Sequence, residues 1–224
     1  MTLAAALAGA AVGIGAVHTC APDHWMPFAA LARAERWSVR RTAAITALCG
    51  LGHVSVSVLL GLLALVFGRE LFQAFGERLE SVSGLLLVGF GTAYAIWGLR
   101  RVVAERMHEQ AHAHGRAHVH FHPRAHRHGA GSRVTPWTLF VLFSADPCVA
   151  VIPLMFASAP LGWTATLAIA AAYEAATIGT MVLLVLPARA AAATVRGAWA
   201  DRYGDALAGA VVALVGLAVV SLGI

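Results

Sequence analysis

The stretch His18-Thr19-Cys20-Ala21-Pro22-Asp23-His24 closes the first long apolar run and places two imidazoles, a carboxylate and a thiol within seven residues. Inside a bilayer a charged residue costs roughly 2.5–3.5 kcal/mol on insertion scales, so ionisable groups there are functional-site candidates. In an unbroken helix, at about 100° per residue, His24 would lie roughly 120° around the axis from His18. Pro22 removes a backbone donor and clashes with the preceding turn. We therefore predict a helix broken at Pro22, whose side chains turn toward one ion site.

The chain as a whole has the composition of an integral membrane protein. Its 224 residues are 59% hydrophobic and 12% charged, which is too apolar for a soluble domain with a polar surface. Apolar runs of about 20 residues match a hydrocarbon core of ~30 Å. We therefore predict an all-α fold with six transmembrane helices, at 3–25, 42–67, 81–99, 136–157, 163–186 and 205–222. All six tryptophans lie at or near the ends of these spans, as in an interfacial aromatic belt.

The arginines indicate the orientation. All 16 basic residues are arginines, and 14 of them lie in the first, third and fifth loops between the predicted spans; only Arg69 and Arg78 lie on the other side. The positive-inside rule then places these loops in the cytoplasm and both termini outside. We expect a protein of the bacterial inner (plasma) membrane. The net charge of +5 follows from this orientation, and no nucleic-acid partner is expected.

An internal repeat relates the two halves. Glycines at 84, 91 and 98 recur at 209, 216 and 223, and the same offset of 125 carries Pro22 onto Pro147. Such glycines allow close approach of a neighbouring helix. Three spans per copy force the copies into opposite orientations, which predicts an inverted repeat with a site between the halves. The predicted units are 1–100 and 136–224; chance recurrence of glycine and proline is the alternative.

The segment between the two units, 101–135, is a predicted cytoplasmic loop of different composition. It contains eight of the eleven histidines, interleaved with Arg, Gly and Ala. We expect it to be disordered, and His-rich tracts of this kind bind transition metals; a flexible polar spacer is the alternative. The histidines are His108, His112, His114, His118, His120, His122, His126 and His128.

The donor types favour a first-row transition metal. Imidazole with carboxylate suits Ni, Co, Zn, Cu or Fe, so we predict His18, Asp23, His24 and His53 as metal ligands. Each of these residues could instead be a packing or hydrogen-bonded residue. Asp146, Cys148 and Glu174 are candidates for an opposite wall or for coupling, with helix–helix contact as the alternative. For the cysteines the packing interpretation leads, because a buried free cysteine behaves as a small hydrophobe.

Two motifs resemble a known family. His18-x4-Asp23-His24 matches the H-x4-D-H signature of the nickel/cobalt permease family, and Pro22-Asp23-His24 looks like its urease-accessory-type branch. Leu51-Gly52-His53, followed by Val and Ser, is similar to the family's second signature. The resemblance implies transport of Ni²⁺ or Co²⁺ through His18, Asp23, His24 and His53. The chain departs from the classical permeases in having six predicted spans where eight are usual. Its His-rich loop resembles the efflux members, so the direction of transport stays open.

We therefore predict a permease for a divalent ion, Ni²⁺ or Co²⁺ first and Zn²⁺ next, without a tightly bound cofactor. No G-x4-G-K-[ST] loop occurs, so nucleotide hydrolysis by this chain, and enzymatic activity more widely, are not expected. The expected partners are the metal ion and the bilayer, with a cytoplasmic metallochaperone and a second copy of the chain as candidates. The alternatives are a transmembrane thiol–disulfide electron carrier using Cys20 and Cys148, or a metal sensor or assembly accessory.

Overall fold

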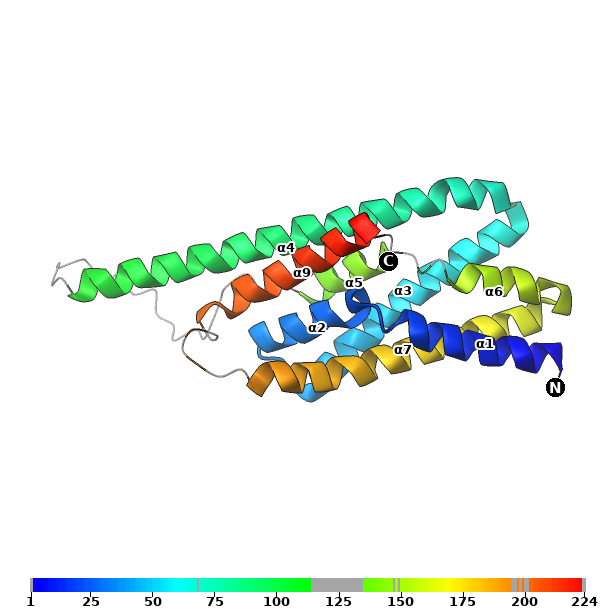
Figure 1. Ribbon diagram of the computed structural model, residues 1–224, viewed down its shortest axis with the longest axis horizontal. Coiled ribbons are helices and arrows are strands. Elements are labelled where there is room, and N and C mark those ends of the chain that lie inside the picture. The colour runs from blue at the N-terminus through cyan, green and yellow to red at the C-terminus, as the bar shows by residue number, and fades with distance from the viewer. Residues whose placement is uncertain are drawn as a thin grey trace.

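Apolar segments of this chain form helices, since only a helix satisfies its backbone N–H and C=O groups within one segment. The computed structural model describes residues 2–67, 69–113, 135–146, 148, 150–194, 197, 199 and 202–222, and no strand occurs among them. Its helices form an elongated bundle (Figure 1). They are α1 (Leu3–His18), α2 (Pro22–Ala34), α3 (Val39–Phe67), α4 (Arg69–Ala113), α5 (Pro136–Ser144), α6 (Val151–Ser158), the 3-10 helix η1 (Ala159–Leu161), α7 (Trp163–Thr194) and α9 (Gly204–Leu222).

Four helices of the described chain are long and apolar enough to cross a membrane: Val39–Phe67, Gly84–Ala104, Trp163–Thr194 and Gly204–Ser221. The pair α1 and α2 passes the same test as one bent span, which makes five. The predicted span 136–157 is instead two helices of 9 and 8 residues, α5 and α6. Each is too short to span ~30 Å alone. Pro147, a residue outside the described ones, falls between α5 and α6 in the sequence. A proline disfavours helical backbone in the residue before it, which is consistent with this interruption.

The predicted break at Pro22 is present. α1 ends at His18, α2 begins at Pro22, and the two axes are bent by 52°. Pro22 occupies the first turn of α2, where its missing N–H costs no helical hydrogen bond. Ala21 before it has an extended backbone, with ψ of 137°. The first span continues through α2 to Ala34, nine residues beyond its predicted end.

The predicted glycine stripes lie at the contact between α4 and α9, which run side by side (Figure 1). A Cβ added to Gly91 would overlap backbone atoms of Ala213, and one added to Gly209 would overlap those of Ala95. Small residues let membrane helices approach to backbone contact. The expectation that these glycines admit a neighbouring helix is therefore confirmed for the stripe positions that the structure describes; Gly223 lies outside the described residues.

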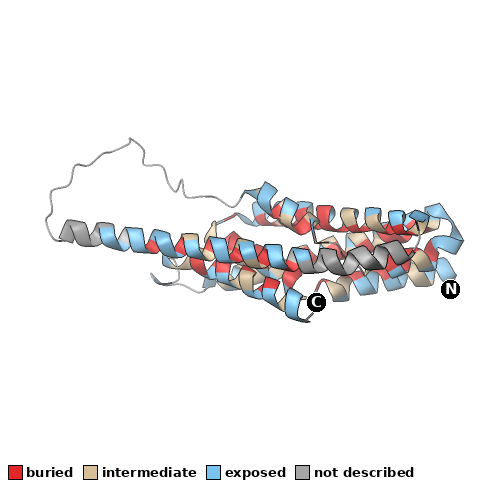
Figure 2. Cartoon of the chain, turned by 90° about the horizontal axis from the view of Figure 1, so that it is seen from above, coloured by how far each residue is buried: buried red, intermediate tan, exposed pale blue. Residues whose placement is uncertain are grey.

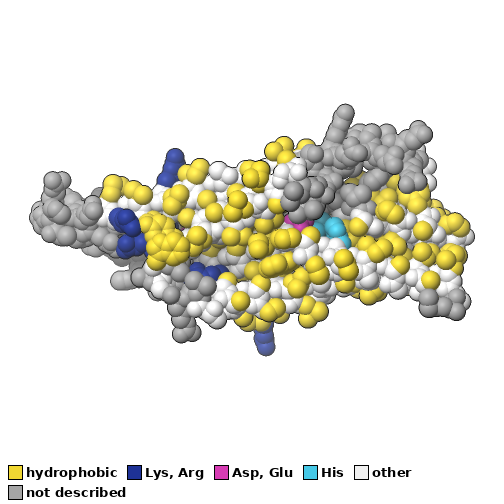
Figure 3. All heavy atoms as spheres, in the orientation of Figure 1, with side chains coloured by type: hydrophobic (Ala, Val, Ile, Leu, Met, Phe, Trp, Pro, Cys, Tyr) yellow, Lys and Arg dark blue, Asp and Glu magenta, His cyan; other side chains and the backbone are white. Residues whose placement is uncertain are grey.

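Burial follows the faces on which helices meet, and the outside is apolar. In Figure 2 the buried positions lie on the inner faces of the bundle, and in Figure 3 hydrophobic side chains cover most of the described face, with Arg side chains toward one end. Exposed Leu, Ile and Val side chains on long helices are what a lipid environment requires. The structure is therefore that of a membrane protein.

Candidate metal centre

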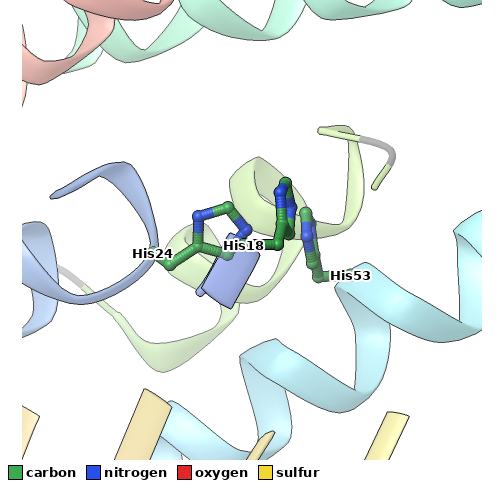
Figure 4. Close-up of side chains that lie close together, drawn as sticks. All are labelled: His18, His24 and His53. Atoms are coloured by element: carbon green, nitrogen blue, oxygen red, sulfur yellow. The ribbon is translucent and has the colours of Figure 1, made fainter. Parts of the chain in front are cut away.

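Three imidazoles meet where the break between α1 and α2 faces the middle of α3. His18 is the last residue of α1, His24 is the third of α2, and His53 lies on α3. One ligand nitrogen from each lies within 4.8 Å of the other two. The ring centroids of His18 and His24 are 4.4 Å apart, and those of His24 and His53 are 5.2 Å apart. Figure 4 shows the three side chains gathered at one point; we call His18, His24 and His53 the imidazole trio.

The break in the first span is what makes this meeting possible. In a straight helix His18 and His24 would lie on different sides of the axis, whereas the 52° bend brings their rings into contact. A second local feature admits α5 beside His53. A Cβ on Gly52 would collide with the side chains of Ser144 and Phe140, so only glycine lets α5 pack this closely against α3.

His53 is held by a backbone carbonyl. Its Nδ1 lies 3.2 Å from the carbonyl oxygen of Phe143, in the last turn of α5. With the Nδ1 proton donated to this oxygen, Nε2 keeps its lone pair free. A hydrogen bond from the second ring nitrogen commonly sets the tautomer and orientation of a metal-binding histidine.

Asp23 joins the site through His24. Its Oδ1 lies 3.0 Å from His24 Nδ1, and the two side chains are only 7% and 4% exposed. The distance is that of an ion pair, although the angles fall short of a hydrogen bond. Asp23 is not a fourth member of the trio, whose mutual nitrogen distances it does not share. It therefore stands where a carboxylate orients an imidazole, a common arrangement around metal-binding histidines.

The trio contains an unusual concentration of unsatisfied nitrogens. Nε2 of His18, His24 and His53 is buried in each case and has no hydrogen-bond partner among the described residues. A buried polar atom left unpaired costs about 1–3 kcal/mol, and such atoms call for an explanation such as an ion. Nitrogens bonded to one ion at about 2.1 Å lie roughly 3–3.5 Å apart. Small side-chain rotations would therefore close the trio around a divalent transition metal.

The other predicted site residues lie outside the trio. The Ser55 hydroxyl donates to Glu174 Oε1 at 3.2 Å. Cys148 Sγ lies 2.7 Å from the Tyr173 hydroxyl, and both side chains are buried. The backbone N–H of Asp146 donates to the Phe143 carbonyl. The structure thus groups three of the four predicted ligands, sets Asp23 beside them, and gives Glu174 and Cys148 partners of their own.

The three cysteines, all within the described chain, are free thiols. Cys20 is exposed and its Sγ contacts the Ala16 carbonyl, whereas Cys49 is fully buried in an apolar cluster. The side chains of His108 and His112, on the last turns of α4, and the whole of His114, His118, His120, His122, His126 and His128 lie outside the described residues.

Sequence reasoning missed the carbonyl of Phe143 as the group that positions His53. A pattern of side chains does not reveal which backbone carbonyl accepts a hydrogen bond, but the internal repeat pointed to this position. The offset of 125 carries His18, which ends α1, onto position 143, one residue before the end of α5. The last carbonyls of a helix lack intrahelical α-type donors, and the Phe143 carbonyl accepts from both the Asp146 N–H and His53 Nδ1.

Comparison with protein-family models, with curated proteins and with solved structures finds no match for this chain. What the site can do is therefore argued from its geometry. Three imidazole nitrogens with an adjoining carboxylate suit first-row transition ions better than oxygen-preferring Mg²⁺ or Ca²⁺.

Proposed function

We propose that this chain is a secondary transporter, rather than an enzyme, that carries a divalent transition-metal ion across the membrane. The observation that carries the proposal is the imidazole trio, three unsatisfied buried nitrogens gathered at a broken helix in the bundle interior. Ni²⁺ and Co²⁺ are the first candidates, in keeping with the resemblance of its motifs to the nickel/cobalt permeases. Zn²⁺ fits the same donors.

A transported ion suits this site better than a permanently held one. Structural zinc sites are closed by four protein ligands, whereas a site with three leaves coordination positions open. Here three imidazoles provide the bonds, and Asp23 contacts the trio through His24. An ion bound this way keeps water or exchanges ligands readily, as release to the other side requires.

The arrangement of helices supports two inverted three-helix units with six spans, the fourth being the broken pair α5 and α6. α1 packs on α7 while α5 packs on α3, and α2 packs on α7 while α6 packs on α3. Gly84 faces Gly216 and Gly91 faces Gly209. The offset of 125 carries Gly84 onto Gly209 and Gly91 onto Gly216, so it exchanges the two glycine contacts. A two-fold relation between the halves requires this exchange. Movement of one half against the other would open the site to each side in turn.

The distribution of arginines supports an orientation in a bacterial inner (plasma) membrane with both termini outside. The His-rich loop is then cytoplasmic, where it can receive the ion from, or pass it to, a metallochaperone. The rival thiol–disulfide carrier gains little from the structure, because Cys20 is exposed while Cys148 is buried against Tyr173.

Radioactive Ni²⁺ flux into proteoliposomes of known orientation tests the proposal, with Co²⁺, Zn²⁺ and Mn²⁺ as competitors. We expect saturable flux that Co²⁺ inhibits strongly and Mn²⁺ weakly, and its loss in His24→Ala. Cys20→Ser is the matched control, because the exposed thiol lies in the same break but outside the trio, and it should transport normally. Flux no greater than in empty liposomes, or undiminished flux in His24→Ala, would overturn the proposal.

A further inference from the structure

Buried hydroxyls in this bundle fall into two groups. In a helix, Ser and Thr usually satisfy their hydroxyls by donating to the carbonyl four residues earlier. Thr42 does so to Ser38, Ser57 to His53 and Thr166 to Gly162. Three others do not: the Oγ atoms of Thr46, Ser144 and Thr177 are buried and make no hydrogen bond of good geometry in the described part of the chain, although Thr177 also interacts with the Tyr173 phenol.

These three hydroxyls lie on α3, α5 and α7, helices that pack around the imidazole trio. Ser144 follows Phe143, and its Oγ would collide with a Cβ on Gly52, the neighbour of His53. Thr177 Oγ1, on α7, would lie 3.0 Å from a Cβ on Gly15, one turn before His18. Thr46 precedes His53 by seven residues on α3, about 10 Å along the helix axis. Thr46 and Thr177 are therefore displaced from the trio toward opposite ends of the bundle.

We propose that Thr46, Ser144 and Thr177 line the route by which a hydrated divalent cation reaches and leaves the imidazole trio. The inference rests on the proposed transport function, and it assigns these hydroxyls the role of neutral oxygen donors. Burying a hydroxyl without a partner is costly, and Thr46 and Thr177 are 0% exposed. A carbonyl acceptor lies one turn away on the same helix in each case. Where a hydroxyl does not donate to this carbonyl, water or a passing ion can take the place of the missing partner.

Neutral oxygens are the appropriate donors for a route, as opposed to a binding site. Conduction requires interactions that are favourable enough for entry and weak enough for exit. A hydroxyl can replace a water in the ion's shell without adding a charge that would trap it. The imidazoles then provide the preference for a transition metal, and the hydroxyls lower the free-energy barrier that the ion crosses on either side of the imidazole trio.

The first test compares two threonines on one face of α3. Both Thr46 and Thr42 are 0% exposed, but only the Thr42 hydroxyl has a partner. Thr46→Val should reduce Ni²⁺ flux about tenfold, a barrier increase that corresponds to loss of one such oxygen contact. Its Ni²⁺ affinity in detergent should stay within about twofold of the wild type. Thr42→Val should retain flux, and equal flux in the two variants would contradict the inference.

The second test needs no transport. In the Cys20→Ser background, Thr46→Cys should react with a charged, membrane-impermeant methanethiosulfonate reagent, and Ni²⁺ should slow the reaction. The native Cys49, also 0% exposed but packed in an apolar cluster, is the internal control and should not react. A Thr46→Cys thiol as inert as Cys49 would overturn the inference even if the wild type transports Ni²⁺. Reactive Thr46→Cys in a protein without flux would instead retain the hydrated route and reject the proposed function.

Discussion

Asp23 approaches the imidazole trio through His24, and this contact gives the carboxylate an orienting role. The 3.0 Å between Asp23 Oδ1 and His24 Nδ1 places negative charge beside the nitrogen that turns away from a bound ion when Nε2 binds it. A carboxylate there fixes the ring and makes Nε2 a better donor. Loss of such an outer partner typically weakens metal binding about 10–100-fold.

We therefore expect Asp23→Asn to lower Ni²⁺ affinity by about 10–100-fold while the protein still inserts and elutes normally from a sizing column. Equilibrium dialysis against Ni²⁺ in detergent measures the change. Glu174→Gln is the matched control, because its carboxylate contacts Ser55 outside the trio, and its affinity should match the wild type. An Asp23→Asn protein that binds Ni²⁺ as tightly as the control would refute the orienting role.

For single residues, the sequence predicts which side chains form the site better than it predicts what each of them does there. His18, His24 and His53 were identifiable because imidazoles inside apolar segments are costly and therefore conspicuous. The position of Asp23 beside the trio depends on a 52° bend whose angle no spacing specifies. Thr46 and Ser144 were not identified, because a hydroxyl that bonds its own helix and one that does not look the same in sequence.

Among the elements, α4 and α9 depend most directly on glycine. The Cβ of an alanine at 91 would overlap the backbone of Ala213, and a backbone cannot move aside as a flexible side chain can. Gly89, two residues earlier on the same helix, has nothing within 4 Å of the position of a Cβ. Alanine at position 91 therefore tests the packing of α4 against α9, whereas alanine at position 89 tests only the helix propensity of α4.

We expect Gly91→Ala to destabilise the bundle by about 1–3 kcal/mol, the usual cost of overpacking. Gly89→Ala should be neutral or stabilising by up to about 1 kcal/mol, because alanine is the better helix former. Thermal unfolding in detergent, followed by the loss of monodisperse protein, compares the two directly. Equal melting temperatures for the two variants would show that α4 and α9 do not pack through these glycines.

Element boundaries show where hydropathy succeeds and fails. The long apolar run of α3 was predicted to within three residues at each end, and the start of α7 was predicted correctly although α7 continues eight residues past its predicted end, because about 20 apolar residues suffice to define a span. The run 136–157 averages as apolar too, but its middle carries Asp146 and Pro147, and α5 ends at Ser144. The average over a window conceals this interruption, although the same proline logic predicted the break at Pro22.

Across the whole molecule, the two ends are held by different forces. At the end rich in arginine, Arg33 Nε donates to the Ala192 carbonyl at 2.7 Å, and Arg189 Nε donates to the Trp37 carbonyl at 3.1 Å. Both bonds tie the first half of the chain to α7. The opposite end is packed by an apolar cluster of α1, α6 and α7 side chains and contains a cavity of about 200 Å³ beside Trp163.

A polar network at the arginine-rich end joins three helices. The Tyr94 hydroxyl on α4 lies 3.0 Å from Glu35 Oε1, at the end of α2, and 3.4 Å from Asp205 Oδ1 on α9. Arg101 donates to Asp205 Oδ2 at 2.9 Å. A phenol has one proton to share between the two carboxylates, so Tyr94 links α4 both to the end of α2 and to α9. This network therefore joins α4, α9 and the end of α2 at the arginine-rich end.

Tyr94→Phe should therefore favour opening at that end. Without the hydroxyl, Glu35 and Asp205 lose the donor that they share, so the hydrogen bonds that join α4 to the end of α2 and to α9 at this end are lost. Thr46 lies on this side of the trio, so a Thr46→Cys thiol reports the opening. In vesicles that present the arginine-rich side to the reagent, Tyr94→Phe should speed methanethiosulfonate labelling of Thr46→Cys about tenfold, equivalent to about 1.4 kcal/mol of closure.

The control for this effect is Arg106→Gln. Arg106 also lies on α4 and donates to the Tyr203 hydroxyl at 2.7 Å, but Tyr203 immediately precedes α9, so this bond does not involve α2. Arg106→Gln should therefore leave the labelling rate of Thr46→Cys near that of the protein with Tyr94 intact. Under the proposed alternating access, opening at one end closes the other, so labelling from the opposite side should slow in Tyr94→Phe. Faster labelling from both sides would instead indicate general loosening of the bundle, and an unchanged rate from the arginine-rich side would show that the network does not restrain it.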